Sequence, residues 1–310
     1  MTSFTPFIEN FCARYQYPAE AVEAFRSLFG RLSSEEDFRA SFEELRGKYL
    51  ACCASLGDTL PALHALAAEK GVREETLDFV FLLSMVEDLW VKYKFIGMEE
   101  AVYWRTMDDL RCKLLECIEN RGVPGTFVTS WFDGFFRLAR FGFGRFQYEI
   151  SRFRLAPGGD PLGVKLPSGR LIRPDEIYIN FHIPSSGIPL TDEVRYDSYR
   201  DAYRRLSPLF PDGKVLFGCG SWLLYPRMKE FLPPHMNILK FQNDFHIIAW
   251  AEKDEFHDAW RLYGRQSGKA PAELPRDTSF RRAYADWLLA GNKAGDGYGF
   301  FLFDGEKITH

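Results

Sequence analysis

Two side chains able to exchange protons stand on neighbouring predicted strands. The first is Glu149, in the alternating stretch FGRFQYEISRF. With a period of two, Arg145, Gln147 and Glu149 share one face of that strand. Such a polar face can line a cleft with Glu149 as a base, or it can be a solvated sheet face holding an Arg–Glu pair.

The second proton-exchanging side chain is His182, at the end of the predicted strand YINFH. Histidine titrates near neutral pH, so it can take up or release a proton under ordinary conditions. The alternative is a histidine at the core edge that is hydrogen-bonded to a backbone carbonyl. Its place at a strand end, directly before a loop, is the feature that supports a functional role, and both interpretations stay open.

The loop after His182, PSSGIPLT, leads into a predicted helix that begins at Thr191 and Asp192. Free amides and the helix dipole favour an anion at such a position. The two prolines have no N–H group, which stiffens the loop and reduces its donors. The loop is therefore either an anion site or an ordinary connection; its candidate donors are Ser185, Ser186, Gly187 and Ile188.

A third segment, VLFGCGSWLL, carries Cys219 and Ser221 on one predicted face, with glycines beside them. Glycine inside a strand often marks a bulge or the close approach of a ligand. Cys219 and His182 could form a nucleophilic pair, or the segment could line a site. Asn237, near the predicted start of the next strand, could bind a ligand or fix a turn.

Composition limits the remaining classes. The chain has 310 residues and a net charge of −4, which gives no electrostatic footprint for nucleic acid. The longest apolar stretch is too short and too charged to span a membrane. The six cysteines and six histidines show no metal-ligand spacing, so we expect no metal, reduced thiols and a cytoplasmic protein.

The positioning elements fall into two groups. Helical periodicity predicts helices over 4–15, 19–32, 36–54, 59–71, 74–96, 98–120 and 126–140. After these the pattern becomes mixed: strands over 141–155, 177–183, 214–224, 238–252 and 297–304, a hairpin over 164–172, and helices over 191–210, 226–232, 254–263 and 278–290.

The C-terminal order of strand, loop, helix and strand resembles the GNAT N-acyltransferase superfamily. The chain is also similar to a bacterial family of acyltransferase-domain proteins with a helical N-terminal domain and a GNAT-like C-terminal domain. The stretches that carry this resemblance are RFGFGRFQYEI (140–150), FHIPSSGIPL (181–190), CGSWLLYP (219–226), MNILKFQNDF (236–245) and DTSFRRA (277–283). The superfamily motif of Gln or Arg, two residues, Gly, one residue and Gly or Ala is absent from 184–191.

The resemblance implies roles for these residues. The amides of 185–188 and the helix start at Thr191 would hold the pyrophosphate of acetyl-CoA or another acyl-CoA. Glu149 or His182 would take a proton from the acceptor amine, and Tyr225 would protonate the leaving thiolate. Ser221 and Asn237 would contact substrate, with Cys219 as the nucleophile of a Cys-dependent alternative.

We therefore predict an α+β chain in two parts, a helical N-terminal bundle (1–125) and a GNAT-like mixed α/β domain (126–310). The predicted function is an acyl-CoA-dependent N-acyltransferase acting on an unidentified small-molecule amine or peptide. The alternative is a non-catalytic GNAT-like protein that binds a metabolite or a protein partner. Neither nucleic acid nor a membrane is an expected partner.

Overall fold

Capping residues set the ends of several helices in the N-terminal part. Ser55 and Asp58 form a reciprocal capping box at the start of α4, and Gly71 and Gly122 end α4 and α7 in the left-handed conformation. The helices are α1 (Pro6–Arg14), α2 (Ala19–Ser34), α3 (Glu36–Leu50), α4 (Leu56–Lys70), α5 (Glu74–Leu83), α6 (Val86–Phe95), α7 (Glu100–Arg121), η1 (Thr129–Phe132) and α8 (Asp133–Phe136).

Two predicted helices differ from the structure. The helix predicted over 74–96 is interrupted between α5 and α6. There the Ser84 hydroxyl donates a hydrogen bond to Phe81 O, and such a side-chain bond to the backbone competes with the hydrogen bonds of a continuous helix. The helix predicted over 126–140 is only the short pair η1 and α8. Its segment is held by tertiary bonds: Thr126 N donates to Glu75 O, and Trp131 Nε1 donates to Asp109 Oδ2.

The computed structural model describes residues 3–155 and 160–310, and the chain divides into two units, Met1–Ala139 and Arg140–His310. The sequence predicts the boundary between the two parts after residue 125. The segment 126–139 lies in the first unit because its hydrogen bonds run to helices of that unit. Within the described ranges, no helix is long and apolar enough to cross a membrane.

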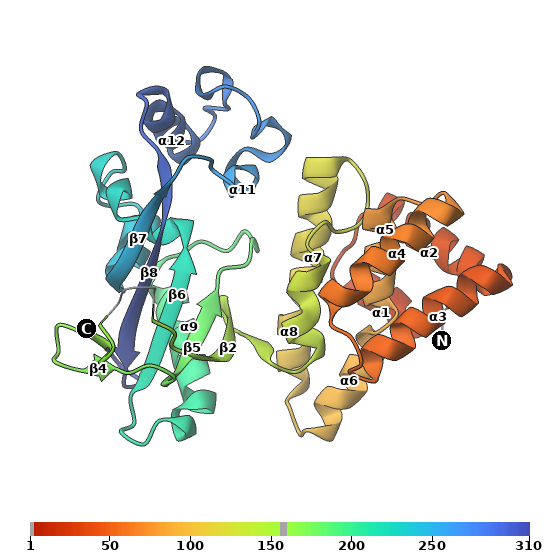
Figure 1. Ribbon diagram of the computed structural model, residues 1–310, viewed down its shortest axis with the longest axis horizontal. Coiled ribbons are helices and arrows are strands. Elements are labelled where there is room, and N and C mark those ends of the chain that lie inside the picture. Colours follow the sequence, from red (N-terminus) through yellow and green to blue (C-terminus); the bar gives the residue numbers. More distant parts are fainter. Residues whose placement is uncertain (1–2, 156–159) are drawn as a thin grey trace. The chain divides into compact units, whose positions relative to one another are not determined.

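A mixed sheet forms the centre of the second unit, in the strand order β1-β2-β5-β6-β8-β7, with β9 paired to β8 (Figure 1). All neighbours are antiparallel except β5 and β6, which are parallel. The strands are β1 (Arg140–Phe143), β2 (Phe146–Arg152), β5 (Ile177–His182), β6 (Val215–Ser221), β7 (His246–Lys253), β8 (Ala294–Phe303) and β9 (Ile308–Thr309); β3 (Val164–Lys165) and β4 (Leu171–Ile172) make the predicted hairpin.

One face of this sheet is covered by aromatic packing from two helices. Tyr199 of α9 lies 5.0 Å from Phe301, and Phe241 of α10 lies 6.2 Å from Phe181, measured between ring centroids. Buried aromatic rings such as these cover a large apolar area of the sheet. The helices of this unit are α9 (Asp192–Leu206), η2 (Ser207–Leu209), η3 (Trp222–Leu224), η4 (Pro226–Glu230), α10 (Asn237–Asn243), α11 (Ala259–Tyr263), η5 (Gly264–Gln266), η6 (Pro271–Glu273) and α12 (Ser279–Leu289).

The stretch expected as one strand over 141–155 is a hairpin of β1 and β2. Phe143 pairs with Phe146, so Gly144 and Arg145 form a two-residue turn. Gly144 has φ +61, and a Cβ there would stand 2.8 Å from Ser198 Cα, so the turn requires glycine. Arg145 therefore does not share a strand face with Glu149, which corrects the predicted polar face.

The second correction concerns residues 238–243, the first part of the strand predicted over 238–252. They form α10 instead, and Asn237 is its first residue. Phe241 of α10 lies 6.2 Å from the Phe181 ring, and Phe245, just after the helix, lies 5.5 Å from it. For this segment, contact with the sheet therefore outweighs the local preference for a strand.

Candidate active site

A polar cluster lies on the sheet face opposite the one covered by α9 and α10. It consists of Arg140, Glu149, Asn180 and His182, hereafter the Glu149 cluster. The register places Arg140 opposite Glu149 on β1 and β2, and Glu149 opposite Asn180 on β2 and β5. His182 follows two residues after Asn180, so its side chain shares that face.

Short contacts join the cluster. His182 Nε2 lies 3.3 Å from Glu149 Oε1, and Asn180 Nδ2 donates to the same oxygen at 3.2 Å. Arg140 binds the other carboxylate oxygen, with Nε donating to Glu149 Oε2 at 2.8 Å. Glu149 and His182 are partly accessible, with 21% and 20% of their side chains exposed, so a ligand can reach them.

The surroundings fix the charge of Glu149. Burial alone would raise the pKa of this carboxyl, but the hydrogen bond and charge of His182, with the Arg140 guanidinium, outweigh burial and lower the pKa to about 2. Glu149 is therefore a carboxylate at neutral pH and accepts protons poorly. It is suited to orient His182 and to stabilise a positive charge on the imidazole.

The parallel strands β5 and β6 separate beside this cluster. Their register contains only Ile179 with Phe217 and Asn180 with Gly218, although β5 continues to His182 and β6 to Ser221. Gly218 is required where they meet, since a Cβ there would lie 2.5 Å from the Phe300 ring. His182 thus stands at the end of one diverging strand and Gly220 on the other.

The predicted anion loop follows β5 and is held from outside by Arg145. Arg145 Nε donates to Ile188 O at 2.9 Å, and its NH1 donates to Pro184 O at 2.8 Å. Gly187 has φ +75 and is exposed, as are Ser185 and Ile188. Ser186 Oγ accepts a hydrogen bond from Ile188 N, so that amide has a local partner.

The helix that follows the loop begins as predicted. Thr191 is the N-cap of α9, and its side chain accepts from Val194 N. Asp192 and Glu193 occupy the first turn, where their charges stabilise the helix dipole but oppose a bound anion. The loop amides, rather than the helix end alone, are therefore the better donors for a phosphate group.

Cys219 does not meet His182. On β6 it alternates with Gly218 and Gly220, so its side chain points to the face covered by α9 and α10. The residue is 1% exposed, and burial raises the pKa of its thiol far above the ordinary value. This placement argues against the predicted nucleophilic pair, because a buried thiol is not available as a thiolate.

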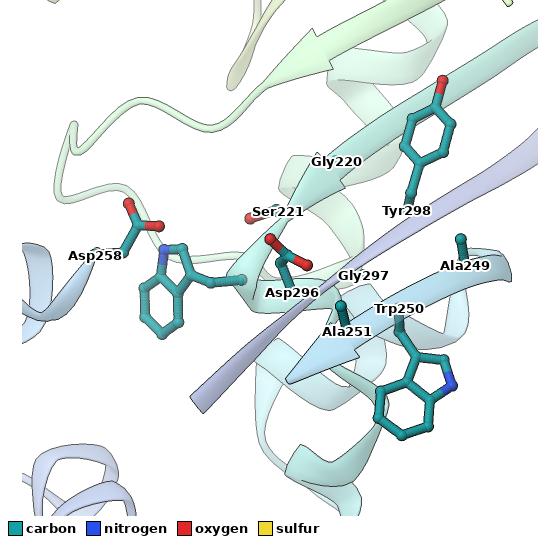
Figure 2. A pocket seen from close by; sticks show the side chains of 10 residues that line it. Gly220, Ser221, Ala249, Trp250, Ala251, Asp258, Asp296, Gly297 and Tyr298 are labelled. Carbon is teal, nitrogen blue, oxygen red and sulfur yellow. The ribbon is translucent and has the colours of Figure 1, made fainter. Parts of the chain in front are cut away.

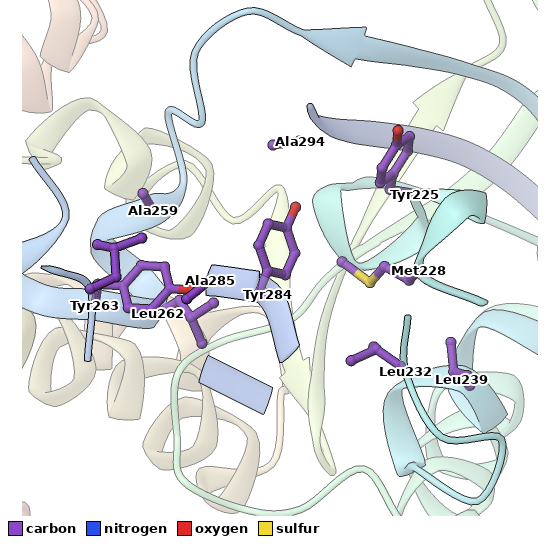
Figure 3. Close-up of a cluster of buried hydrophobic side chains, with 11 residues drawn as sticks. Tyr225, Met228, Leu232, Leu239, Ala259, Leu262, Tyr263, Tyr284, Ala285 and Ala294 are labelled. Carbon is purple, nitrogen blue, oxygen red and sulfur yellow. The ribbon is translucent and has the colours of Figure 1, made fainter. Parts of the chain in front are cut away.

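Tyr225 also lies apart from the Glu149 cluster. It is fully buried in a hydrophobic cluster with Met228, Leu239 and Tyr284 (Figure 3). Its hydroxyl donates to Glu252 Oε1 at 3.2 Å, and burial together with that carboxylate raises the pKa of Tyr225. Its ring contacts the position of Gly295, on the face opposite His182, so the structure does not support the predicted role as thiolate acid.

The two residues predicted to contact substrate, Ser221 and Asn237, do not lie in the same pocket. Ser221 lines a pocket of about 480 Å³ at the ends of β6, β8 and β7 (Figure 2), and its Oγ accepts from Leu223 N. Asn237 begins α10 and does not line that pocket. Among the described residues no cluster of His, Cys, Asp or Glu is arranged to hold a metal ion.

Two residues of the Glu149 cluster, Arg140 and Asn180, were not predicted from the sequence as site residues. The alternation of Asn180 and His182 on one strand was a signal, because residues two apart share a face. Arg140 could not be assigned without the β1–β2 hairpin, which brings it opposite Glu149.

Comparison with known proteins identifies both parts of the chain. Residues 140–301 match the family described as GNAT-like C-terminal domain, and residues 6–138 match the family described as N-acyltransferase N-terminal domain. No curated protein was found to match the sequence.

Solved structures share the fold at low sequence identity. An acyltransferase variant in complex with octanoyl-CoA is 16% identical, with a TM-score of 0.73, covering 98% of this chain and 88% of that one. An acyltransferase in complex with decanoyl-CoA is 18% identical, with a TM-score of 0.59, covering 94% and 98%. A complex with decanoyl-CoA and teicoplanin has a TM-score of 0.61 at the same identity and coverage. The predicted fold and family are confirmed: this chain belongs to the N-acyltransferases that combine an N-acyltransferase N-terminal domain with a GNAT-like C-terminal domain.

Proposed function

We propose that this protein transfers an acyl group from acyl-CoA to a primary amine, with the Glu149 cluster as its reaction centre. The observation that carries the proposal is the 3.3 Å contact between the partly exposed side chains of Glu149 and His182, beside the point where β5 and β6 separate. In the reaction, the amine nitrogen attacks the thioester carbonyl carbon and the C–S bond breaks. The amine loses one proton, the thiolate gains one, and the products are an amide and free CoA.

His182 is the proposed base. Glu149 is too weakly basic for this task because its pKa is about 2, whereas an imidazole can accept the proton of the attacking amine. The carboxylate of Glu149, at 3.3 Å, then stabilises the imidazolium. His182 returns the proton to the departing thiolate, which replaces the role first assigned to Tyr225.

The loop over 184–191 is the proposed site for the CoA pyrophosphate. The proposal rests on the exposed loop at Ser185, Gly187 and Ile188, and on the cap at Thr191. Arg145 holds two loop carbonyls, which leaves the loop in one shape before the ligand arrives and reduces the entropy lost on binding. Ser186 contributes by fixing Ile188 N.

The ligands bound in similar structures suggest which acyl donor and which acceptor this protein uses. Octanoyl-CoA and decanoyl-CoA are bound in similar structures, so medium-chain acyl-CoA is the proposed donor, with acetyl-CoA as the short-chain comparison. A small amine or an amine-bearing peptide is the proposed acceptor, since one related complex holds teicoplanin. The free cysteines fit the proposed cytoplasmic location, where thiols stay reduced.

Calorimetric titration of octanoyl-, decanoyl- and acetyl-CoA into the purified chain tests the donor site. The control is Gly187→Pro, which cannot keep φ +75 and loses an N–H group. Saturable micromolar binding that weakens at least tenfold in the variant supports the loop as the site. Equal binding by both proteins contradicts the loop assignment, and no binding to the parent chain contradicts the use of acyl-CoA.

A non-catalytic, ligand-binding protein is the second candidate. Pro184 and Pro189 remove donors from the loop, and Asp192 and Glu193 place negative charge at the helix start. These features weaken phosphate binding without affecting the fold. In this case the chain would bind a metabolite or protein without releasing CoA from any acyl-CoA, even when amines are supplied.

A further inference from the structure

The pocket of about 480 Å³ is built on the ends of three neighbouring strands (Figure 2). Its floor consists of small residues, with Gly220 on β6, Gly297 on β8, and Ala249 and Ala251 on β7. A Cβ at Gly220 would lie 3.4 Å from Tyr298 Cδ2, so a larger residue there would fill the floor. The volume is in the range of pockets that hold small molecules, roughly 300–1,000 Å³.

The pocket lies on the same sheet face as His182. Asn180 is paired with Gly218, and both His182 and Gly220 follow two residues later on their parallel strands. Gly220 is in turn opposite Tyr298, which is two residues from Asp296. The face that carries the proposed base therefore continues across the separation of β5 and β6 into the floor of the pocket.

Carboxylates are the charged groups of the pocket lining. Asp258 and Asp296 both line it, and none of its ten lining residues is Lys or Arg. Each has a partner outside the lining: Asp296 lies 3.1 Å from Lys253 Nζ, and Asp258 accepts from Arg261 Nε at 2.8 Å. The side chain of Asp296 is still 45% exposed and that of Asp258 40% exposed, so a second cation can approach their carboxylate oxygens.

An aromatic wall completes the pocket. Trp222 lines it and follows directly after β6. Its ring stacks on Phe280 at 5.9 Å and meets Phe256 edge-on at 5.5 Å, which fixes its orientation. A rigid indole near carboxylates is suited to a ligand cation, because the negative face of the ring attracts an ammonium group.

From this lining we propose that the pocket binds the acceptor, and that the acceptor is an amine carrying a second ammonium group and no carboxylate on the part that enters. The inference rests on the proposed N-acyltransferase function. One amino group is acylated beside His182, while the other is held by Asp258, Asp296 and Trp222. The same carboxylates repel acidic amines, such as free amino acids.

The probes are three amines of one length: 1,6-diaminohexane, hexylamine and 6-aminohexanoate. They differ only in whether the far end is cationic, neutral or anionic. Binding is measured by calorimetry at low salt without acyl-CoA, and turnover is measured as CoA release from octanoyl-CoA. We expect 1,6-diaminohexane to bind about tenfold more tightly than hexylamine, the size of one charge-assisted hydrogen bond, and 6-aminohexanoate to bind least. Spermidine and 2-deoxystreptamine, which carries two amino groups on a ring, then distinguish a linear polyamine from a cyclic diamine as the source of the cation.

The matched variants are Asp258→Asn with Asp296→Asn, and Asp254→Asn as the control. Asp254 is 89% exposed, is paired with Lys293 and does not line the pocket. The double variant should reduce the preference for 1,6-diaminohexane over hexylamine to near one, while Asp254→Asn should leave it unchanged. Thermal unfolding of each variant confirms that it is folded.

The outcomes separate this inference from the proposed function. CoA release without a preference for the diamine, or with a preference that survives the double variant, overturns the inference and leaves the acyltransferase proposal standing. Diamine binding that depends on the two aspartates, without any acyl-CoA binding or CoA release, supports the cationic site and contradicts the acyltransferase proposal. No binding of any probe amine by the parent chain overturns the inference.

Discussion

At the scale of single residues, the proposed reaction centre depends on the contacts that hold the Glu149 carboxylate. Glu149 touches His182, Asn180 and Arg140, and Arg140 is itself only 9% exposed. Removing the Glu149 carboxylate would deprive the nearly buried Arg140 guanidinium of one of its partners, which destabilises a protein more than the loss of a surface ion pair does. The cluster is therefore expected to affect stability as well as proton transfer.

Glu149→Gln should lower the free energy of unfolding at pH 7 by up to about 3 kcal/mol, judged from a pKa that falls from 4.5 to about 2. Because the folded-state pKa lies below the unfolded value, Glu149 contributes stability above pH 4.5. That contribution is lost as the pH falls from 4.5 towards 2. Urea unfolding at pH 7 and pH 3 should show a difference between parent and variant that shrinks at pH 3.

The control for this prediction is Glu255→Gln, whose side chain is 80% exposed and which should leave stability unchanged at both pH values. A difference between parent and Glu149→Gln that is equally large at pH 3 would contradict the assigned ionisation.

At the scale of elements, the β1–β2 hairpin decides which residues reach the site. It places Arg140 opposite Glu149 and sends Arg145 to the carbonyls of the 184–191 loop. One turn thus positions both the reaction centre and the proposed phosphate loop. Two-residue turns with glycine first are favoured in such hairpins because they match the twist of the strands.

Gly144→Ala should destabilise the protein by about 1–3 kcal/mol, because alanine is strained at φ +61 and its Cβ would meet Ser198 Cα at 2.8 Å. The matched control is Gly268→Ala in the same unit, where nothing lies within 4 Å of the added Cβ. Denaturant midpoints measure both effects. An unchanged midpoint for Gly144→Ala would show that the turn tolerates a side chain and does not fix the hairpin.

The sequence predicted most elements but missed this turn. The aromatic residues of RFGFGRFQYEI alternate on both sides of the turn, at 141 and 143 and then at 146 and 148, so the stretch resembles one strand although the alternation shifts by one residue at Gly144–Arg145. The Gly144–Arg145 pair was the available signal. The strand predicted from residue 238 begins as a helix instead, because the contact of Phe241 with Phe181, which the local sequence does not reveal, favours the helix.

The candidate site was predicted in part, for a physical reason. Glu149 and His182 were predicted as site residues from residue type and strand position, and the register brings their side chains to 3.3 Å from each other. Cys219 and Tyr225 carry suitable chemistry as well, but strand parity and burial place them on the other face. Alternation shows which residues of a strand share a face, but which of the two faces α9 and α10 cover depends on packing between segments far apart in the sequence.

At the scale of the whole molecule, ligand binding should be visible as stability. A ligand that binds only the folded chain stabilises it by mass action, by about 2.7 kcal/mol at one hundred times its Kd. Octanoyl-CoA at that concentration should therefore raise the melting temperature measured by calorimetry, and free octanoate should not. A melting temperature that rises equally in the Gly187→Pro variant would contradict binding at the loop.

The most direct test of the central claim is product formation by the parent chain and by His182→Ala. Both proteins are incubated with octanoyl-CoA and a panel of primary amines, and free CoA and acylated amine are measured together by mass spectrometry. We expect the parent to form one acylated amine for each CoA released, and His182→Ala to react at least one hundredfold more slowly, the typical contribution of a positioned base. An equal rate in the variant would contradict His182 as the base, and no product from the parent with any amine would contradict the acyltransferase assignment itself.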